Sequence, residues 1–345
     1  MVNDTKDSLP MKKRIGLTYD LKTDWQTSGV EPVDASAEWD PIETIHALKG
    51  AFEGRGHEVL LIGGARQLAQ SLGAGTLNVD MVFSISEGQR GRNRESLVPA
   101  LLELYGIPFS GSDALTLGMS LDKVVAKQIF IANGIPTPRY FIARHPDDCN
   151  ANSLPFPLFV KTSHEGTSKG ITASSRVENY RQLVDQVKVI NESYHQPALV
   201  EEFIKGLEFT VAVVGNESPR ALPIIQYSLR GNTNLGDSYY TFQHVSESLM
   251  DHECVHDQDI GKDLAHTLRL LAVKAYVAIG CRDFGRVDFR VDDNGQVFVL
   301  EINPLPDLSR KPKGAFLLCA NALGVAYDDV INGILDAALL RHNIS

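Results

Sequence analysis

The segment GCRDFGRVDFRVDDNGQVFVLEINP, residues 280–304, decides the fold expected for this chain. Apolar and charged residues alternate from Val287 to Asp292, and this period of two predicts a β-strand. The run Asp293-Asn294-Gly295 comes next and predicts a tight turn. A second apolar stretch, from Val297 to Ile302, then predicts the returning strand of a β-hairpin.

Three oxygen-bearing side chains lie where this hairpin would bring them together. Asp288 is on the first strand, while Glu301 and Asn303 lie at the end of the second. Two carboxylates and an amide oxygen form the hard oxygen site that Mg²⁺ prefers, with water and phosphates supplying its remaining ligands. Arg286 shares the face of Asp288 and is placed to meet a negative charge. The hairpin predicts a magnesium site for phosphoryl chemistry; the alternative is a solvated acidic hairpin end.

Length and composition limit the number of domains and the class of protein. The chain has 345 residues, which predicts two or three domains, with 43% hydrophobic and 22% charged residues. A net charge of −10 argues against nucleic-acid binding. No apolar run is long enough to span a bilayer, and residues 1–12 are expected to form a flexible tail without a signal peptide. The four cysteines show no paired spacing, which favours a reducing, cytoplasmic setting.

Residues 13–119 alternate between strand and helix patterns. This order predicts a parallel sheet in a doubly wound α/β domain, with strands at 13–18, 58–62 and 80–85 and helices at 41–54 and 65–72. Such sheets bind ligands beyond the carboxyl ends of their strands, so the loop Ser86–Glu95 is placed for binding. Its three arginines are expected to hold an anion; a solvated basic loop is the alternative.

A second binding element follows the strand that ends at Lys161. The loop from Thr162 to Gly170 contains two glycines and hydroxyl residues whose amides and hydroxyls can close over phosphates. It lacks the G-x-x-x-x-G-K-[ST] spacing of a P-loop. Lys161 ends an otherwise apolar strand, and a lysine in that place needs an anion or carboxylate as a partner. Lys123 opens a helix directly after Asp122. With the hairpin, these residues predict a nucleoside triphosphate site.

Taken together, four segments resemble the ATP-grasp ligases, and among them the D-alanine–D-alanine ligase family. They are Leu121–Lys123, Phe159–Ser168, Leu199–Val211 and Gly285–Asn303. The resemblance implies an α+β ATP-grasp fold. It places a doubly wound N-terminal domain at 13–119, a central subdomain with the phosphate loop at 120–205 and a C-terminal subdomain with the metal site at 206–345. ATP would lie between the last two.

The resemblance also implies a role for each matching residue. Lys123 and Lys161 would contact the ATP phosphates, and Glu208 the ribose. The adenine would lie against Glu201, Glu202, Phe203 and Ile204. Two magnesium ions, with manganese as an alternative, would be held by Asp288, Glu301 and Asn303, with Glu301 bridging. The catalytic set would comprise Arg286, which stabilises an oxyanion, with Thr167 and Ser168 of the loop.

The reaction implied is ATP-dependent ligation of a carboxylate to an amine through an acyl phosphate, on amino-acid or peptide substrates and in a homodimer. The substrate segments depart from the family pattern at the N-terminus, at 86–95, in the lid expected at 230–245 and at 304–311. Arg310 and Lys311 are candidates for a substrate carboxylate, or form a solvated turn. Two alternatives therefore stay open: a ligase for another amino acid or peptide in a specialised pathway, or a non-catalytic nucleotide-binding protein.

A zinc-hydrolase pattern also occurs. The run His252-Glu253-Cys254-Val255-His256 matches H-E-x-x-H. That motif needs a helix to place both histidines on one face. The run lies instead between the expected lid and a helix starting near Asp257, and we expect an exposed acidic entry to that helix.

Overall fold

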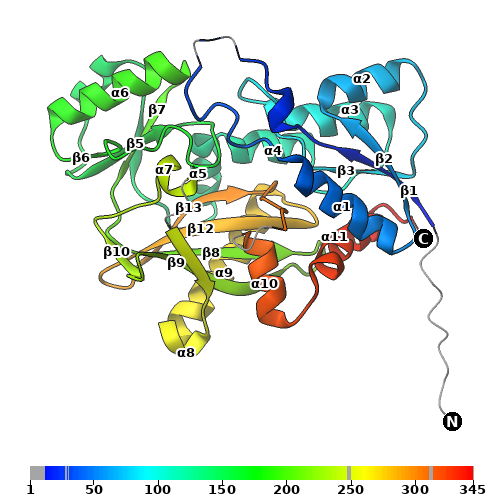
Figure 1. Ribbon diagram of the computed structural model, residues 1–345. Coiled ribbons are helices and arrows are strands. Elements are labelled where there is room, and N and C mark those ends of the chain that lie inside the picture. The colour runs from blue at the N-terminus through cyan, green and yellow to red at the C-terminus, as the bar shows by residue number, and fades with distance from the viewer. Residues whose placement is uncertain (1–11, 28, 30, 247–249, 311–313, 345) are drawn as a thin grey trace.

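The computed structural model describes residues 12–27, 29, 31–246, 250–310 and 314–344. The tail expected at residues 1–12 falls almost entirely outside this part of the chain. Three sheets organise the fold (Figure 1). The boundaries expected near residues 119 and 205 stay predictions.

The N-terminal sheet is parallel and has helices on both faces. Its order is β2-β1-β3. Ile15 and Phe83 pack with α1 on one face, and Val82 packs with α2 and α3 on the other. This confirms the doubly wound arrangement. The elements are β1 (Arg14–Thr18), η1 (Lys22–Asp24), α1 (Ile42–Gly54), β2 (Glu58–Gly63), α2 (Ala65–Gly73), β3 (Met81–Ser84), η2 (Arg94–Ser96), α3 (Leu97–Tyr105) and α4 (Ala114–Leu121).

The central sheet is antiparallel, in the order β4-β7-β5-β6, and α6 covers it. Its elements are α5 (Lys123–Ala132), β4 (Tyr140–Ala143), η3 (Pro146–Ala151), β5 (Leu158–Thr162), β6 (Arg176–Val177), α6 (Tyr180–Tyr194) and β7 (Ala198–Glu202). Asp122 caps α5 by accepting hydrogen bonds from the backbone N–H groups of Val124 and Val125. The cap begins α5 at Lys123, where the sequence predicted the start of a helix, and separates α5 from α4.

The C-terminal sheet has the order β11-β9-β8-β12-β13, with β10 paired to β8. One face packs on α9 and α5, and the other on α10 and α11. Helix α11 also packs on α1, and Arg55 pairs with Asp336 at 2.7 Å, so the two ends of the chain share a core. The elements are β8 (Gly206–Val214), β9 (Arg220–Leu229), β10 (Asn234–Gly236), α7 (Phe242–Ser246), β11 (Met250–Cys254), α8 (Asp257–Ile260), α9 (Lys262–Ile279), β12 (Phe284–Asp292), β13 (Val297–Asn303), α10 (Ala315–Leu323) and α11 (Tyr327–Arg341).

The hairpin formed by β12 and β13 is the one expected. Gly295 adopts a φ of +80° in its turn, which glycine tolerates without strain. The register places Asp288 opposite Glu301 and Arg286 opposite Asn303. Cross-strand neighbours in an antiparallel pair lie within about 5.5 Å, so the four polar side chains are gathered at one end of the hairpin.

Candidate active site

Every side chain that the sequence linked to ATP, metal or catalysis lines one cavity of roughly 600 Å³. The cavity is bounded by the central and C-terminal sheets and by loops of the N-terminal domain. The thirteen residues are Lys123, Lys161, Thr167, Ser168, Glu201, Glu202, Phe203, Ile204, Glu208, Arg286, Asp288, Glu301 and Asn303. The structure brings them together, while their individual roles stay predictions.

The two lysines expected to meet phosphates are buried and paired with carboxylates. Lys123 begins α5, and its Nζ lies 3.2 Å from Glu301 Oε2. Lys161 lies on β5, with its Nζ 2.8 Å from Glu201 Oε2. Both lysines therefore line the cavity, and each is paired with one carboxylate.

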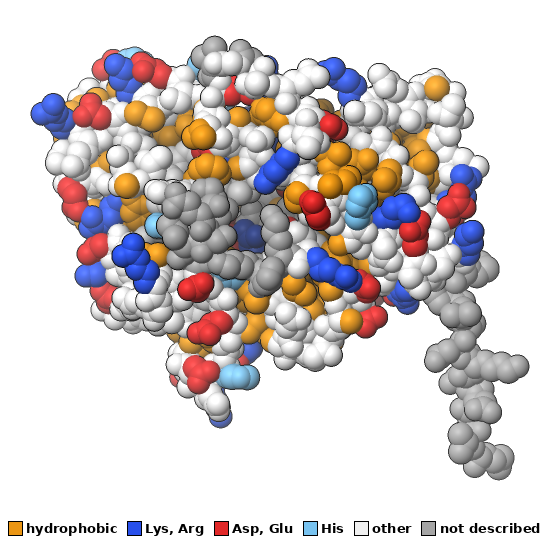
Figure 2. Space-filling view, viewed as in Figure 1, with side chains coloured by type: hydrophobic (Ala, Val, Ile, Leu, Met, Phe, Trp, Pro, Cys, Tyr) orange, Lys and Arg blue, Asp and Glu red, His pale blue; other side chains and the backbone are white. Residues whose placement is uncertain are grey.

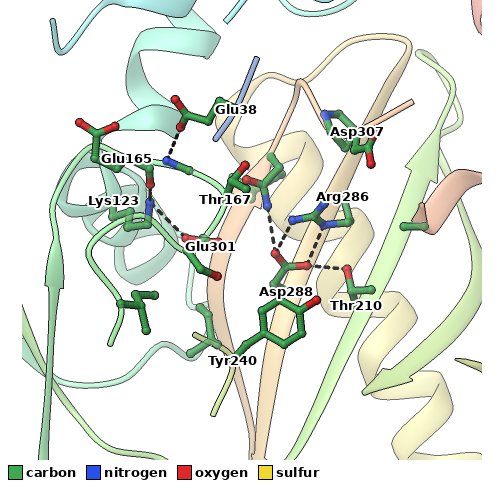
Figure 3. Close-up of a pocket in the computed structure, with 18 of the residues that line it drawn as sticks. Glu38, Lys123, Glu165, Thr167, Thr210, Tyr240, Arg286, Asp288, Glu301 and Asp307 are labelled. Carbon is green, nitrogen blue, oxygen red and sulfur yellow. Dashed lines mark hydrogen bonds and ion pairs between the residues drawn. The ribbon is translucent and has the colours of Figure 1, made fainter. Parts of the chain in front are cut away.

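Asp288 is held by three neighbours (Figure 3). Arg286 makes a two-pronged contact with it, with Nε 3.0 Å from Oδ1 and Nη2 2.9 Å from Oδ2. Asn303 Nδ2 donates to Asp288 Oδ2 at 3.0 Å, and the Thr210 hydroxyl donates to Oδ1. These contacts fix the carboxylate at the cavity wall beside Arg286.

The oxygen set fits a divalent cation. Burial alone would raise the pKa of Glu301, but Lys123, Lys161 and Arg286 outweigh it and lower the pKa to about 2. Glu301 is therefore ionised at neutral pH, opposite Asp288 in the hairpin. No cluster of three histidine, cysteine or acidic residues suited to a metal occurs in the described ranges. The candidate set is instead two carboxylates and an amide, a donor set that suits magnesium with phosphate ligands.

Behind the wall expected to meet the adenosine lies a fully buried lysine, Lys127, that the sequence did not single out. Glu201 is buried between Lys161 and Lys127, and these two lysines lower its pKa against the opposing effect of burial. Lys127 lies one helical turn after Lys123, and this i, i+4 spacing was the available signal. Glu208 pairs with Arg290 at 2.8 Å, and the Arg290 guanidinium lies 5.6 Å from the Phe203 ring.

The glycine-rich loop carries backbone strain and is tied to a distant carboxylate. Thr167 and Ser168 adopt positive φ values of 47° and 56°, which are uncommon for residues other than glycine. Glu38 accepts a hydrogen bond from the Gly166 N–H at 2.6 Å and pairs with Lys169 at 3.0 Å. Sequence reasoning missed Glu38, because no local pattern connects it with a loop more than 120 residues away.

The segment expected to form a lid borders the cavity. The Tyr239 hydroxyl donates to the Thr172 carbonyl at 2.9 Å, and its ring packs edge-on against Phe159 at 4.9 Å. Tyr240 packs against Tyr227 at 5.3 Å. Both tyrosines line the cavity. The mobility of residues 230–245 stays a prediction.

The loop Ser86–Glu95 does not present its arginines to the cavity, which corrects the expected anion site. Their guanidinium groups are paired with carboxylates: Arg90 with Glu31, Arg92 with Asp122, and Arg94 with Glu38 and Glu165. The loop residues that do line the cavity are Glu87 and Glu95. Sequence reasoning passed over both, because the arginines dominate the composition of the loop.

The two remaining expectations concern His252–His256 and Arg310. Met250–Cys254 forms strand β11, so the H-E-x-x-H run lacks the helix that a zinc site needs, and His256 precedes α8. The expected entry to a helix at Asp257 is confirmed. Arg310 pairs with Asp328 and lies 4.8 Å from the Tyr327 ring, which fits the solvated alternative. Lys311 lies outside the described residues.

Comparisons with solved structures define the class. The D-alanine–D-alanine ligase from Bacillus anthracis, solved in complex with ATP, superposes with a TM-score of 0.71 at 22% identity, covering 96% of this chain and 99% of that chain. The VanG D-Ala:D-Ser ligase from Enterococcus faecalis superposes with a TM-score of 0.72 at 19% identity, covering 95% and 100%. At these identities the likeness shows the fold, which is that of the ATP-grasp ligases.

Sequence comparisons define the family. A family model described as D-ala D-ala ligase C-terminus matches residues 129–336. A D-alanine–D-alanine ligase from Carboxydothermus hydrogenoformans is 31% identical over 303 residues, which are 85% of this chain and 92% of that protein. The uncharacterized protein y4sG from Sinorhizobium fredii is 36% identical over 310 residues, 88% and 90%. The chain belongs to the D-alanine–D-alanine ligase family and is an ATP-dependent ligase of the ATP-grasp type.

Two further observations concern the surface and the membrane. Acidic and basic side chains are interspersed over the face shown in Figure 2. Within the described ranges, every helix is too short or too polar to cross a bilayer.

Proposed function

We propose that the protein uses ATP to activate the carboxylate of an amino acid or peptide and joins it to an amine. One observation carries this proposal. Lys123, Lys161 and Arg286 line the same cavity as the oxygen set of Asp288, Glu301 and Asn303. Cations and metal-binding oxygens on one wall are what phosphoryl transfer requires.

The side chains divide the work between two steps. A carboxylate oxygen of the donor attacks the γ-phosphorus of ATP, which forms an acyl phosphate and ADP; the amine then attacks the acyl carbon, and phosphate leaves. Lys123 and Lys161 bind the phosphates. Arg286 stabilises the negative charge on the carbonyl oxygen during the amine attack. The tyrosines at 239 and 240 exclude water from the acyl phosphate.

Asp288, Glu301 and Asn303 would hold the divalent metal, two magnesium ions with Glu301 shared between them, or manganese in their place. Bound metal neutralises charge on the transferring phosphoryl group. We also propose a homodimer, as the family resemblance suggests. The cysteines that the structure describes are free thiols, which supports a cytoplasmic location.

Phosphate release from ATP tests the proposal. Pairs of D- and L-amino acids and dipeptides, D-alanine included, would be screened with Mg²⁺, and product masses measured. Asp288→Ala and Glu301→Ala should abolish release, while Asp185→Ala, at an exposed position on α6, should leave it unchanged. Undiminished turnover in the first two variants would refute the metal site. Binding of Mg-ATP without release across the whole panel would support non-catalytic nucleotide binding.

A further inference from the structure

The connection between β1 and α1 reaches across to α6 and the glycine-rich loop. Its two ends are tied together, because the Lys22 N–H donates to the Asp40 carbonyl and the Asp40 N–H donates to the Asp20 carbonyl, each at 3.0 Å. The residues between these ties therefore project from the N-terminal sheet as a closed loop (Figure 1). We call residues 31–40, which make the contacts described next, the strap.

Asp34 of the strap is buried and joins two separate elements. Only 4% of its surface is exposed. Its Oδ2 accepts a hydrogen bond from the Gly170 N–H at 2.8 Å. The hydroxyl of Tyr194, the last residue of α6, donates to the same oxygen at 2.8 Å and lies 3.1 Å from Oδ1. One carboxylate thus connects the end of the glycine-rich loop with the end of α6.

The surroundings of Gly170 hold this junction in one arrangement. Gly170 has a φ of +77°, and a Cβ there would lie 2.7 Å from Thr162 Cγ2 and 3.3 Å from Tyr194 Cζ. Burial and the charge of Asp34 raise the pKa of Tyr194 above its ordinary value, so the phenol keeps its proton and stays a donor. Close packing and two hydrogen bonds therefore fix the junction together.

The strap holds the glycine-rich loop at two points. Glu38 accepts a hydrogen bond from the Gly166 N–H at 2.6 Å. Asp34 does the same for the Gly170 N–H, so that acidic residues four positions apart on the strap hold glycines four positions apart on the loop. The positive φ values of Thr167–Ser168 lie between these two points. Strained backbone of this kind persists only where its surroundings impose it.

We propose that Asp34 is a positioning residue for ATP, which acts through Gly170 and Tyr194 to hold the glycine-rich loop in the shape that receives the phosphates. The inference rests on the proposed function, because it takes the nucleotide to lie against this loop. Among the residues that the structure describes, those lining the cavity include Thr167 and Ser168 but not Asp34, so its effect passes through the loop. A loop already held in its binding shape loses less conformational entropy when the ligand binds.

Three variants separate the parts of this junction. Asp34→Ala removes the acceptor of both hydrogen bonds, Asp34→Asn keeps an amide oxygen in its place, and Tyr194→Phe removes one donor. Hydrogen–deuterium exchange of the ligand-free protein reports on the loop itself. Calorimetry with Mg²⁺ and a non-hydrolysable ATP analogue reports on binding without turnover. Failure of the wild type to bind the analogue would refute the proposed function, while a variant that binds like the wild type would refute the role of Asp34 alone.

We expect the amides of residues 166–170 to exchange about tenfold or more faster in Asp34→Ala. The analogue should bind about tenfold or more weakly, the size of a hydrogen bond to a charged group. Asp34→Asn should restore most of both properties, because its amide oxygen still accepts from both donors. Tyr194→Phe should have an intermediate effect, and it should add little in the Asp34→Ala background, where the hydroxyl has lost its partner.

Tyr180→Phe is the matched control. Tyr180 is the first residue of α6, and its hydroxyl donates to Asn150 at 2.7 Å, away from the strap. This variant should exchange and bind like the wild type. Unchanged or tighter binding of the analogue in Asp34→Ala would overturn the proposal, and tighter binding would mean that the strap restrains the loop instead. If Asp34→Ala does not fold, Tyr194→Phe decides, and wild-type exchange and binding in that variant would overturn the proposal.

Discussion

Replacing Glu95 with glutamine is expected to stabilise the ligand-free protein at neutral pH. Burial raises the pKa of Glu95 to about 7; Glu38 and Glu165 act in the same direction, and Arg94 and Lys123 oppose them. In the unfolded chain the carboxyl group titrates near its ordinary value of 4.5. Between these two pH values the folded protein holds a proton that the unfolded chain has released. The contribution of this proton to the free energy of unfolding is therefore fully present below pH 4.5 and is lost as the pH rises through 7.

The size of the effect follows from the shift. A pKa raised from 4.5 to about 7 corresponds to roughly 3 kcal/mol of folding free energy lost between the two pH values, at about 1.4 kcal/mol per unit. Glutamine keeps the shape of the protonated acid and has no charge to bury. The variant should therefore match the wild type near pH 4.5 and exceed its stability by up to about 3 kcal/mol at pH 8.

Urea unfolding at pH 5, 6, 7 and 8, without nucleotide, measures this difference. Glu43→Gln reports the effect of the same substitution at an exposed position. Parallel pH profiles for the wild type and Glu95→Gln would refute the reasoning, because they would mean that Glu95 titrates alike in the folded and unfolded chains.

Four other outcomes are expected. Arg286→Lys should lower the kcat of phosphate release by about 100- to 1,000-fold with the KM for ATP little changed, as steady-state kinetics would show, because a fixed donor to the reacting oxygen is lost. Lys127→Met should destabilise the fold by about 1–3 kcal/mol in urea, because Glu201 loses one of its two buried cations while Lys161 still pairs with it; exposed Lys188→Met is the control. Glu38→Ala should raise the KM for ATP about tenfold or more by freeing the glycine-rich loop; an unchanged KM would contradict that role. Elemental analysis of the purified protein should find no stoichiometric zinc, and zinc lost together with activity in His252→Ala would reverse the conclusion drawn from β11.

The features that could be predicted from the sequence are those with local signals. The hairpin from Phe284 to Asn303 has alternation and a turn within a few residues, so the convergence of Asp288, Glu301 and Asn303 at one end could be predicted, although the irregular register after Asp288 could not. The strands and helices of the N-terminal sheet likewise have their own periodicity. In the ATP wall, Lys123 begins a helix, and Lys161 and Glu202 lie at or next to the ends of their strands. Topology brings such positions together.

The features that escaped prediction depend on partners far away in the sequence. Glu38 reaches Gly166 across a sequence separation of 128, and Arg94 reaches His164 across one of 70. Composition made the loop Ser86–Glu95 look like an anion site, yet each arginine is neutralised by a distant carboxylate. The side chains of this loop that line the cavity are instead Glu87 and Glu95. The sign of a site depends on which charges are already paired, and a local pattern does not contain that information.

At the end of the cavity expected to bind ATP, the charges are already paired. At the ATP end Lys123 pairs with Glu301 and Arg286 with Asp288. Phosphates alone would draw Lys123 away and leave Glu301 buried without a cation, while a metal alone would leave Lys123 unpaired. Lys123 and Glu301 would therefore both regain a partner of opposite charge only if nucleotide and metal bind together. We expect the binding of nucleotide and the binding of metal to be coupled for this reason.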